Sequence, residues 1–244
     1  MTSLVIEADW PAASHVRACV SLRGGGVSSG PYSSLNLATH VGDRPDAVAR
    51  NRSRLGAALE LPSEPRWLEQ VHGTRVVDLD EPWSGAADAS VTRRPGVVAV
   101  VLTADCLPVL FADRRGRRVA AAHAGWRGLA GGVLENTLAA LHSDPEDLLA
   151  WLGPAIGAAA YEVGDEVRAA FVATHASHAD AFERNPRGRW QADLYALARF
   201  ELQALGVKEI HGGQWCTRTE SERFFSHRRE APCGRMATLV WLDA

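Results

Sequence analysis

Hydrophobic positions along the chain recur at two spacings, one typical of helices and one typical of strands. Val48, Leu55 and Leu59 recur at helical spacing, which predicts a helix over residues 45–59. A run of valines predicts a buried strand over 96–103. The same reasoning predicts further helices over 129–141, 165–175 and 192–205, and further strands over 66–79, 208–214 and 237–242.

A β-hairpin is predicted where two short apolar runs, 107–112 and 118–122, flank a turn centred on a pair of arginines. In a register symmetric about that pair, Cys106 lies directly opposite His123, and both side chains point to the same face. Pro108 cannot donate a hydrogen bond to a neighbouring strand, so its strand is expected at an edge or in an irregular segment. The hairpin therefore brings a thiol and an imidazole together at an open position.

The order of these elements predicts an α+β fold. Helices and hairpins are mixed without strict alternation of strand and helix, which favours mixed or antiparallel sheets. No repeat, low-complexity tract or linker divides the 244 residues, and a chain of this length can bury a sizeable core by itself. We therefore expect a single domain over residues 1–244.

Composition and charge exclude several classes of function. The net charge of −3 gives no field that would attract nucleic acid, and no run of about 20 apolar residues could span a membrane. The arginines of 114–118 are expected to form a solvated turn, and His175 and His178 are expected at the surface. Four widely spaced cysteines and the lack of a signal-peptide pattern favour the reducing cytoplasm. We therefore expect a cytoplasmic protein without nucleic-acid or membrane partners.

Three side chains suit a soft metal ion. The hairpin pairs Cys106 with His123, and His72 precedes a glycine at the end of a predicted strand. Two imidazoles and a thiolate supply three ligands to zinc and leave the fourth position open, which is typical of catalytic sites. The spacings of 34 and 17 residues match no short metal-binding motif, so ordinary burial in the core is the alternative interpretation.

Two glycine-containing segments suit an anion. The loop 23–28 begins with Arg23 and could expose backbone amides to an anion, or it could simply form a turn. The segment 123–128 leads into a predicted helix, so Arg127 and the free amides of the first turn could hold a phosphate. The alternative is that these glycines only permit close packing and that Arg127 is a surface charge.

A set of ordered motif blocks resembles the YfiH-type family, whose members are described as multicopper polyphenol oxidases (laccases) or as purine nucleoside phosphorylases. The resemblance extends from about Val16 to Leu242, nearly the whole chain. The matching blocks are 23–28, 34–37, 40–43, 70–73, 103–110, 122–128, 153–157, 161–166, 216–217, 225–229 and 234–236.

The resemblance implies a metal centre, a fold and an activity. The metal ligands of the family match His72, Cys106 and His123, which would be both the metal-binding and the catalytic residues. The fold is expected to resemble the catalytic domain of the cytotoxic necrotizing factor toxins, a sandwich of mixed β-sheets flanked by helices. The implied activities are phosphorolysis of adenosine, inosine and methylthioadenosine, and hydrolytic deamination of adenosine. The expected cofactor is zinc, although the ligand types also allow copper.

Five residues in the matching blocks are candidates for binding the purine nucleoside and phosphate. Arg23 and Arg127 are the candidates for phosphate because their guanidinium groups are cationic. Asn36, Gln70 and Asp105 are the candidates for hydrogen bonds to the sugar or base. These assignments rest on motif membership and residue chemistry.

Three other functions remain open at this point. A copper-dependent polyphenol oxidase would need several coppers and many histidine ligands, whereas the sequence offers one coherent cluster of three. A metal-free cysteine hydrolase would use Cys106 as nucleophile and His123 as base. A structural zinc or interaction module would bind the ion without turning over any nucleoside.

Overall fold

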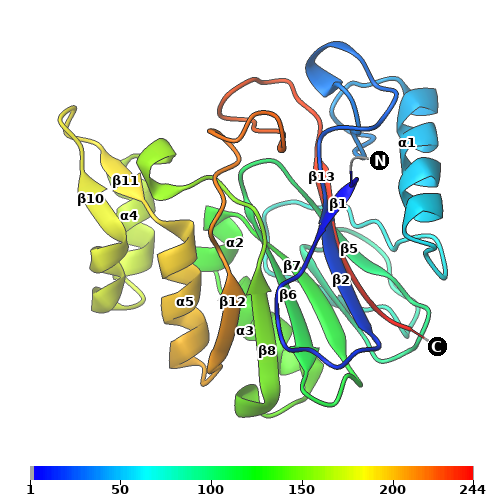
Figure 1. The fold of residues 1–244 in the computed structure, drawn as a ribbon. Helices are drawn as coiled ribbons and strands as arrows, with labels where there is room; N and C mark the ends of the chain where they lie inside the picture. Colours follow the sequence, from blue (N-terminus) through cyan, green and yellow to red (C-terminus); the bar gives the residue numbers. More distant parts are fainter. Residues whose placement is uncertain (1–2, 244) are drawn as a thin grey trace.

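Two β-sheets packed face to face form the centre of the molecule (Figure 1). The computed structural model describes residues 3–243. The smaller sheet has the strand order β1-β2-β13-β5, formed by Val5–Glu7, Val16–Ser21, Met236–Leu242 and Ala99–Thr103. The larger sheet has the order β12-β8-β6-β7-β4-β3, formed by Glu209–Gly212, Leu148–Leu152, Leu107–Asp113, Val119–Ala124, Ala89–Thr92 and Val76–Asp78.

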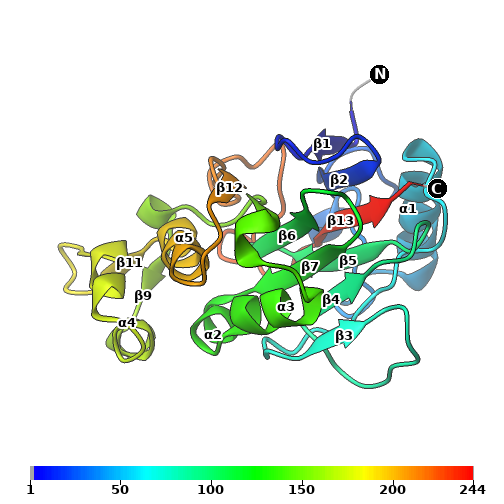
Figure 2. The ribbon, with the colours of Figure 1, turned by 90° about the horizontal axis from the view of Figure 1, so that it is seen from below.

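Helices cover the outer faces of both sheets, so the molecule has four layers (Figure 2). Helices α2 (Trp126–Ala130), α3 (Val133–Leu141) and α5 (Leu194–Ala204) pack on the larger sheet. Helix α1 (Pro45–Ala58) and the chain around Leu35 cover the smaller sheet. None of the helices within residues 3–243 is long and apolar enough to cross a membrane.

A smaller unit lies beyond α5 at one end of the molecule (Figure 1). It contains helix α4 (Asp165–Val172) and a three-stranded sheet of β10, β11 and β9, formed by Phe182–Arg184, Trp190–Ala192 and Glu162–Val163. Short 3₁₀ helices occur at Gly30–Tyr32, Pro145–Asp147, Ala158–Ala160 and Ala176–Ala181.

The predicted α+β fold with mixed sheets is confirmed. Two strand pairs, β12–β8 and β3–β4, are parallel, and the remaining pairs are antiparallel. Helix α5 follows the sequence signals closely, because the Asp193 carboxylate accepts from the Tyr195 and Ala196 amides at its start. Gly206 ends it in the left-handed region with φ of 94°.

Two predicted elements are shorter or divided. The helix predicted over 129–141 is broken at Gly132, whose φ of 92° no helix can accommodate, and the chain begins its helical course earlier, at Trp126. Of the strand predicted over 66–79, only β3 forms. Val71 lies in a loop with 57% of its surface exposed. Strands β1, β2, β4 and β8, and the three-stranded sheet of β9, β10 and β11, were not predicted.

The hairpin forms, but its predicted register is wrong by two residues. Pro108, rather than Cys106, lies opposite His123, and Cys106 lies just before β6. The turn is longer than the symmetric one because the Asp113 carboxylate accepts hydrogen bonds from the amides of Arg117 and Arg118. A shift of two residues preserves the face of every side chain, so the predicted approach of Cys106 and His123 survives.

The expectation that Pro108 confines its strand to an edge is also wrong. Strand β6 lies inside the larger sheet, between β8 and β7. The carbonyl of Pro108 accepts from the Gly153 amide at 2.9 Å, just past the end of β8 at Leu152. The N–H that proline lacks would face the Gly153 carbonyl, and the Tyr195 hydroxyl lies 3.3 Å from that carbonyl, so the proline is tolerated inside the sheet.

Two of the residues expected at the surface are instead packed into the protein. His178 is buried against Phe171 and Phe200, and its imidazole lies 3.4 Å from the Glu201 carboxylate. Arg118 donates hydrogen bonds to the last carbonyls of α3 rather than standing free in a solvated turn.

Candidate metal centre

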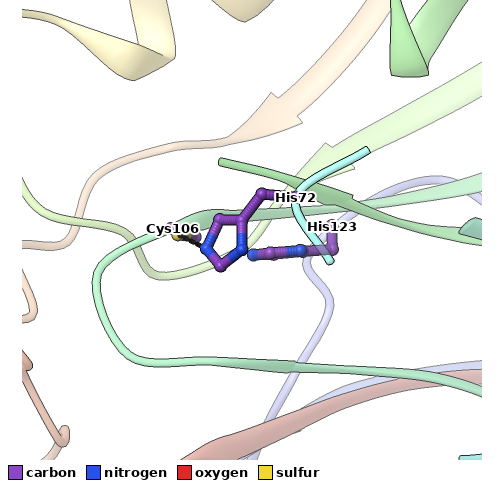
Figure 3. Close-up of side chains that lie close together, drawn as sticks. All are labelled: His72, Cys106 and His123. Atoms are coloured by element: carbon purple, nitrogen blue, oxygen red, sulfur yellow. Dashed lines mark hydrogen bonds between the residues drawn. The ribbon is translucent and has the colours of Figure 1, made fainter. Parts of the chain in front are cut away.

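Three separate segments bring His72, Cys106 and His123 together (Figure 3). His72 lies in the loop before β3, Cys106 directly precedes β6, and His123 lies near the end of β7. Their ligand atoms all lie within 4.8 Å of one another, and Cys106 Sγ is 3.8 Å from His72 Nε2. A thiolate and an imidazole bound to one tetrahedral zinc are separated by about 3.5 Å. The three side chains therefore form a candidate metal site of the right size.

His123 is held in one orientation by a buried carboxylate. The imidazole is 3% exposed, and its Nδ1 lies 2.8 Å from Oδ1 of Asp88, which is completely buried. This contact leaves Nε2 facing Cys106 and His72. A carboxylate on the remote nitrogen of a histidine ligand is the usual device that fixes its tautomer.

The same carboxylate holds the backbone of the His72 loop. The amides of Val71, His72 and Gly73 donate to Asp88 at 3.2, 2.9 and 2.7 Å. His72 has a φ of 60°, a left-handed conformation that is uncommon for residues other than glycine. The amides point inward to the carboxylate, while the His72 side chain is exposed at the mouth of the cluster.

Cys106 follows a strained residue whose side chain anchors the loop. Asp105 has a φ of 93°, and its carboxylate accepts from Thr217 Oγ1 and from the Arg228 amide, both at 2.6 Å. Its carbonyl accepts from the Ile156 amide at 3.0 Å. These contacts fix the position from which the thiol of Cys106 reaches the two histidines.

Gly125 leaves room for the cluster. A Cβ atom at this position would lie 3.0 Å from Cys106 Sγ and 3.0 Å from His72 Cδ2. Contacts this short are tighter than ordinary packing, so any larger residue would push two candidate ligands aside.

The electrostatics of the cluster favour an ionised thiol. Burial alone would raise the pKa of Cys106, but the neighbouring His123 and His72 lower it to about 6. Burial also opposes protonation of His123, but the Cys106 thiolate and the bond to Asp88 raise its pKa to about 9. Burial opposes ionisation of Asp88 too, yet the bonds from His123 and the Gly73 amide hold its pKa below the usual range. At neutral pH the metal-free cluster is therefore a thiolate–imidazolium pair.

Comparison with known proteins matches the whole chain. A family described as multi-copper polyphenol oxidoreductase laccase matches residues 17–243. The purine nucleoside phosphorylase YfiH of Escherichia coli (strain K12) is 55% identical over 244 residues, which cover 99% of this chain and 100% of that protein. The chain belongs to the YfiH family. A purine nucleoside phosphorylase of Pseudomonas aeruginosa is 56% identical over 237 residues, covering 96% of this chain and 97% of that one.

Solved structures of YfiH-family members have the same fold. A protein of Neisseria meningitidis superposes with a TM-score of 0.94 at 51% identity, over 99% of this chain and 100% of that one. YlmD of Geobacillus stearothermophilus superposes with a TM-score of 0.87 at 32% identity, over 95% and 93% of the two chains.

Three of the residues predicted to bind substrate make contacts within the protein. Arg23 donates to the carbonyls of Ser33 and Ser221 and to the Glu230 carboxylate. Asn36 is completely buried and bonds to Ala38, Asp43 and the Arg235 amide. Gln70 exchanges two hydrogen bonds with the backbone of Leu102, on β5. None of these contacts is with His72, Cys106 or His123, and their substrate roles stay predictions.

Arg127 and two residues that the sequence analysis did not single out lie around the cluster. The exposed guanidinium of Arg127 stacks on Trp126, 4.4 Å from the ring centroid. The guanidinium of Arg228 lies over Tyr161 at 5.2 Å. Burial and then the charge of the Cys106 thiolate raise the pKa of Tyr161, while Arg228 and Arg127 oppose the shift. A phenol that stays protonated and two cations therefore lie near the thiol.

Asp88 was also missed. The position of Gly125 agrees with the alternative interpretation of 123–128, in which the glycines permit close packing. Asp88 follows two alanines in an unremarkable segment, and nothing in the local sequence indicates that its carboxylate joins two distant histidines.

Proposed function

We propose that the protein is a zinc-dependent purine nucleoside phosphorylase acting on adenosine, inosine and methylthioadenosine, with adenosine deaminase activity. The observation that carries the proposal is the cluster of His72, Cys106 and His123, three ligands with an exposed histidine at its mouth. Relatives at 55% and 56% identity, named purine nucleoside phosphorylases, support the reaction. The substrates would be the nucleoside together with phosphate or water, and the four free cysteines suit a cytoplasmic protein.

The residues of the cluster would hold the metal, and the surrounding residues would bind the substrate. Zinc held by these residues would supply a Lewis acid to the reaction. The exposed guanidinium of Arg127 donates no hydrogen bond to any residue within 3–243, so it is available for phosphate. Tyr161 keeps its proton and can donate a hydrogen bond to the sugar or the departing base. Asp105 holds the Cys106 loop, since both of its oxygens already accept hydrogen bonds.

The donor set suits a single zinc ion better than it suits the several copper ions of a multicopper oxidase. Within residues 3–243 the cluster is the one group of three or more His, Cys, Asp or Glu side chains close enough to share an ion. A multicopper enzyme needs several such groups. The pair of histidines and one cysteine would also accept a single copper, which makes copper-dependent phenol oxidation the alternative for this centre.

The test is to incubate the purified protein with adenosine, with and without phosphate, and to identify the products. Adenine and ribose 1-phosphate formed only with phosphate indicate phosphorolysis, and inosine indicates deamination. If the zinc-loaded protein formed neither of these products, the proposal would be overturned. Oxidation of a phenol that requires added copper would favour the oxidase instead.

A metal-free cysteine hydrolase is the second candidate, and the thiolate–imidazolium pair of Cys106 and His123 favours it. The predicted likeness to the cytotoxic necrotizing factor catalytic domain points the same way. Removing metal with a chelator separates the two functions. Turnover that disappears with the metal and returns with zinc supports the phosphorylase, whereas full turnover of a substrate by the metal-free protein supports the hydrolase. Stoichiometric zinc without any turnover would indicate a structural module.

A further inference from the structure

One buried carboxylate contacts both of the segments that carry the histidines of the cluster. Asp88 Oδ1 accepts from the His72 amide at 2.9 Å and lies 2.8 Å from Nδ1 of His123. Its Oδ2 accepts from the Val71 and Gly73 amides at 3.2 and 2.7 Å. The backbone of Asp88 is held directly before β4, because its amide donates to the Arg75 carbonyl and its carbonyl accepts from the His123 amide.

We propose that Asp88 is the positioning residue of the metal centre and sets the orientation of both histidines. Oδ1 selects the His123 tautomer that directs Nε2 to the ion, and the three amides bound by the carboxylate hold His72 in its left-handed conformation. The inference rests on the proposed metal function. It adds that the affinity of the centre for its ion depends on a side chain that never touches the ion.

The arrangement of hydrogen-bond donors around Asp88 predicts that asparagine cannot replace this carboxylate. If the amide oxygen faced His123, the amide nitrogen would face the N–H groups of Val71 and Gly73, and donors would meet donors. If the amide were turned, its nitrogen would face Nδ1 of His123 and require the tautomer whose Nε2 carries a proton. The first orientation releases the His72 loop, and the second removes the lone pair that binds the ion. Either one disturbs a ligand while the volume of the side chain is unchanged.

Asp80 provides a matched control at the opposite end of the β3–β4 pair. Its carboxylate, also well buried, accepts from Thr92 Oγ1 and from the amide and Nε of Arg93, and it contacts no residue of the cluster. Asp88→Asn and Asp80→Asn therefore both remove one charge from a hydrogen-bonded carboxylate in the same sheet. A general loss of fold stability would affect both variants, whereas a loss of the contacts with the cluster would affect Asp88→Asn alone.

The experiment measures zinc affinity by competition with a chromophoric chelator, and coordination from the visible spectrum of the cobalt-loaded protein. We expect Asp88→Asn to lower zinc affinity about 10- to 100-fold and to change the cobalt spectrum, with Asp80→Asn like the wild type. Equal affinity and equal spectra in the two variants would overturn the inference. A wild-type protein that binds no zinc would overturn the metal centre itself, and this inference with it.

A measurement on the unsubstituted protein covers the case in which Asp88→Asn fails to fold. Nitrogen-15 NMR of labelled histidine in the zinc-loaded protein identifies which ring nitrogen of each histidine carries the proton. We expect His123 to carry its proton on Nδ1, hydrogen-bonded to Asp88. A proton on Nε2 of His123 would overturn the role assigned to Asp88.

Discussion

Gly125 lies against Cys106, so close that a Cβ atom on the glycine would be 3.0 Å from the sulfur. We expect Gly125→Ala to displace Cys106 and His72, lower the free energy of unfolding by about 1–3 kcal/mol and weaken zinc binding about 10- to 100-fold. Denaturant unfolding and chelator competition measure the two effects.

Gly56 is the control for this substitution. It lies within α1, and a Cβ there would have no atom within 4 Å. Gly56→Ala is expected to raise the free energy of unfolding by about 0.5–1 kcal/mol, because alanine favours the helix, and to leave zinc affinity unchanged. Unchanged zinc affinity in Gly125→Ala would show that the cluster tolerates the added methyl group.

Zinc binding should release about one proton at pH 7.5. At this pH the metal-free Cys106, with a pKa of about 6, is already a thiolate, whereas His123, with a pKa of about 9, still carries the proton that the metal must displace. Apparent affinity should therefore rise about tenfold per pH unit between pH 6 and 9, and more steeply below pH 6, where the thiol also binds a proton. Calorimetric titration in buffers of different ionisation enthalpy counts the protons. A binding heat that does not depend on the buffer would contradict the ion pair.

Zinc should protect one cysteine selectively from alkylation. The thiols of Cys106 and of the half-buried Cys216 have lowered pKa values, whereas burial raises those of Cys19 and Cys233. We expect iodoacetamide at pH 7 to modify Cys106 and Cys216 in the metal-free protein, with zinc slowing the reaction at Cys106 alone. Peptide mass spectrometry follows each site, and Cys216 is the internal control. Equal slowing at both sites would mean that zinc acts through the fold rather than through the cluster.

Arg118 should contribute to stability although it belongs to a run of surface arginines. Its guanidinium donates to the carbonyls of Leu141 and His142 at the end of α3, which otherwise lack partners in the helix. Arg118→Ala is expected to lower the free energy of unfolding by about 1–2 kcal/mol. The exposed Arg115 is the control, and Arg115→Ala should change stability by less than about 0.5 kcal/mol. Equal effects in thermal or denaturant unfolding would show that the helix end is not stabilised by this contact.

Local patterns were sufficient to predict most helices and the hairpin. The hairpin prediction failed in its register, because the Asp113 carboxylate binds the amides of Arg117 and Arg118 and lengthens the turn, and in the edge position expected for the Pro108 strand. Each side chain still points to the predicted face of the sheet, because the register is shifted by an even number of residues. The approach of Cys106 and His123 could therefore be predicted from residue parity even though their direct pairing was wrong.

The loop that carries His72 could not be predicted in the same way. Val71 has the character of a strand residue, but the amides of the loop bind the Asp88 carboxylate instead of a neighbouring strand. Asp88 is separated from His72 by 16 residues and from His123 by 35. Sequence periodicity describes neighbours within one element, so it carries no information on a side chain that joins the His72 loop to a strand of the sheet.

The candidate ligands also define two loops, because His72 and Cys106 are 34 positions apart in the sequence and Cys106 and His123 are 17 positions apart. An ion held by all three would close both loops at once, as disulfides do in secreted proteins, and closing a loop of about 15 residues is worth about 3 kcal/mol of unfolded-chain entropy. Unlike a disulfide, this cross-link needs no oxidant and is undone by chelation. Withdrawal of the ion would therefore loosen the protein at both loops, which would make the supply of metal a control on how long each molecule survives.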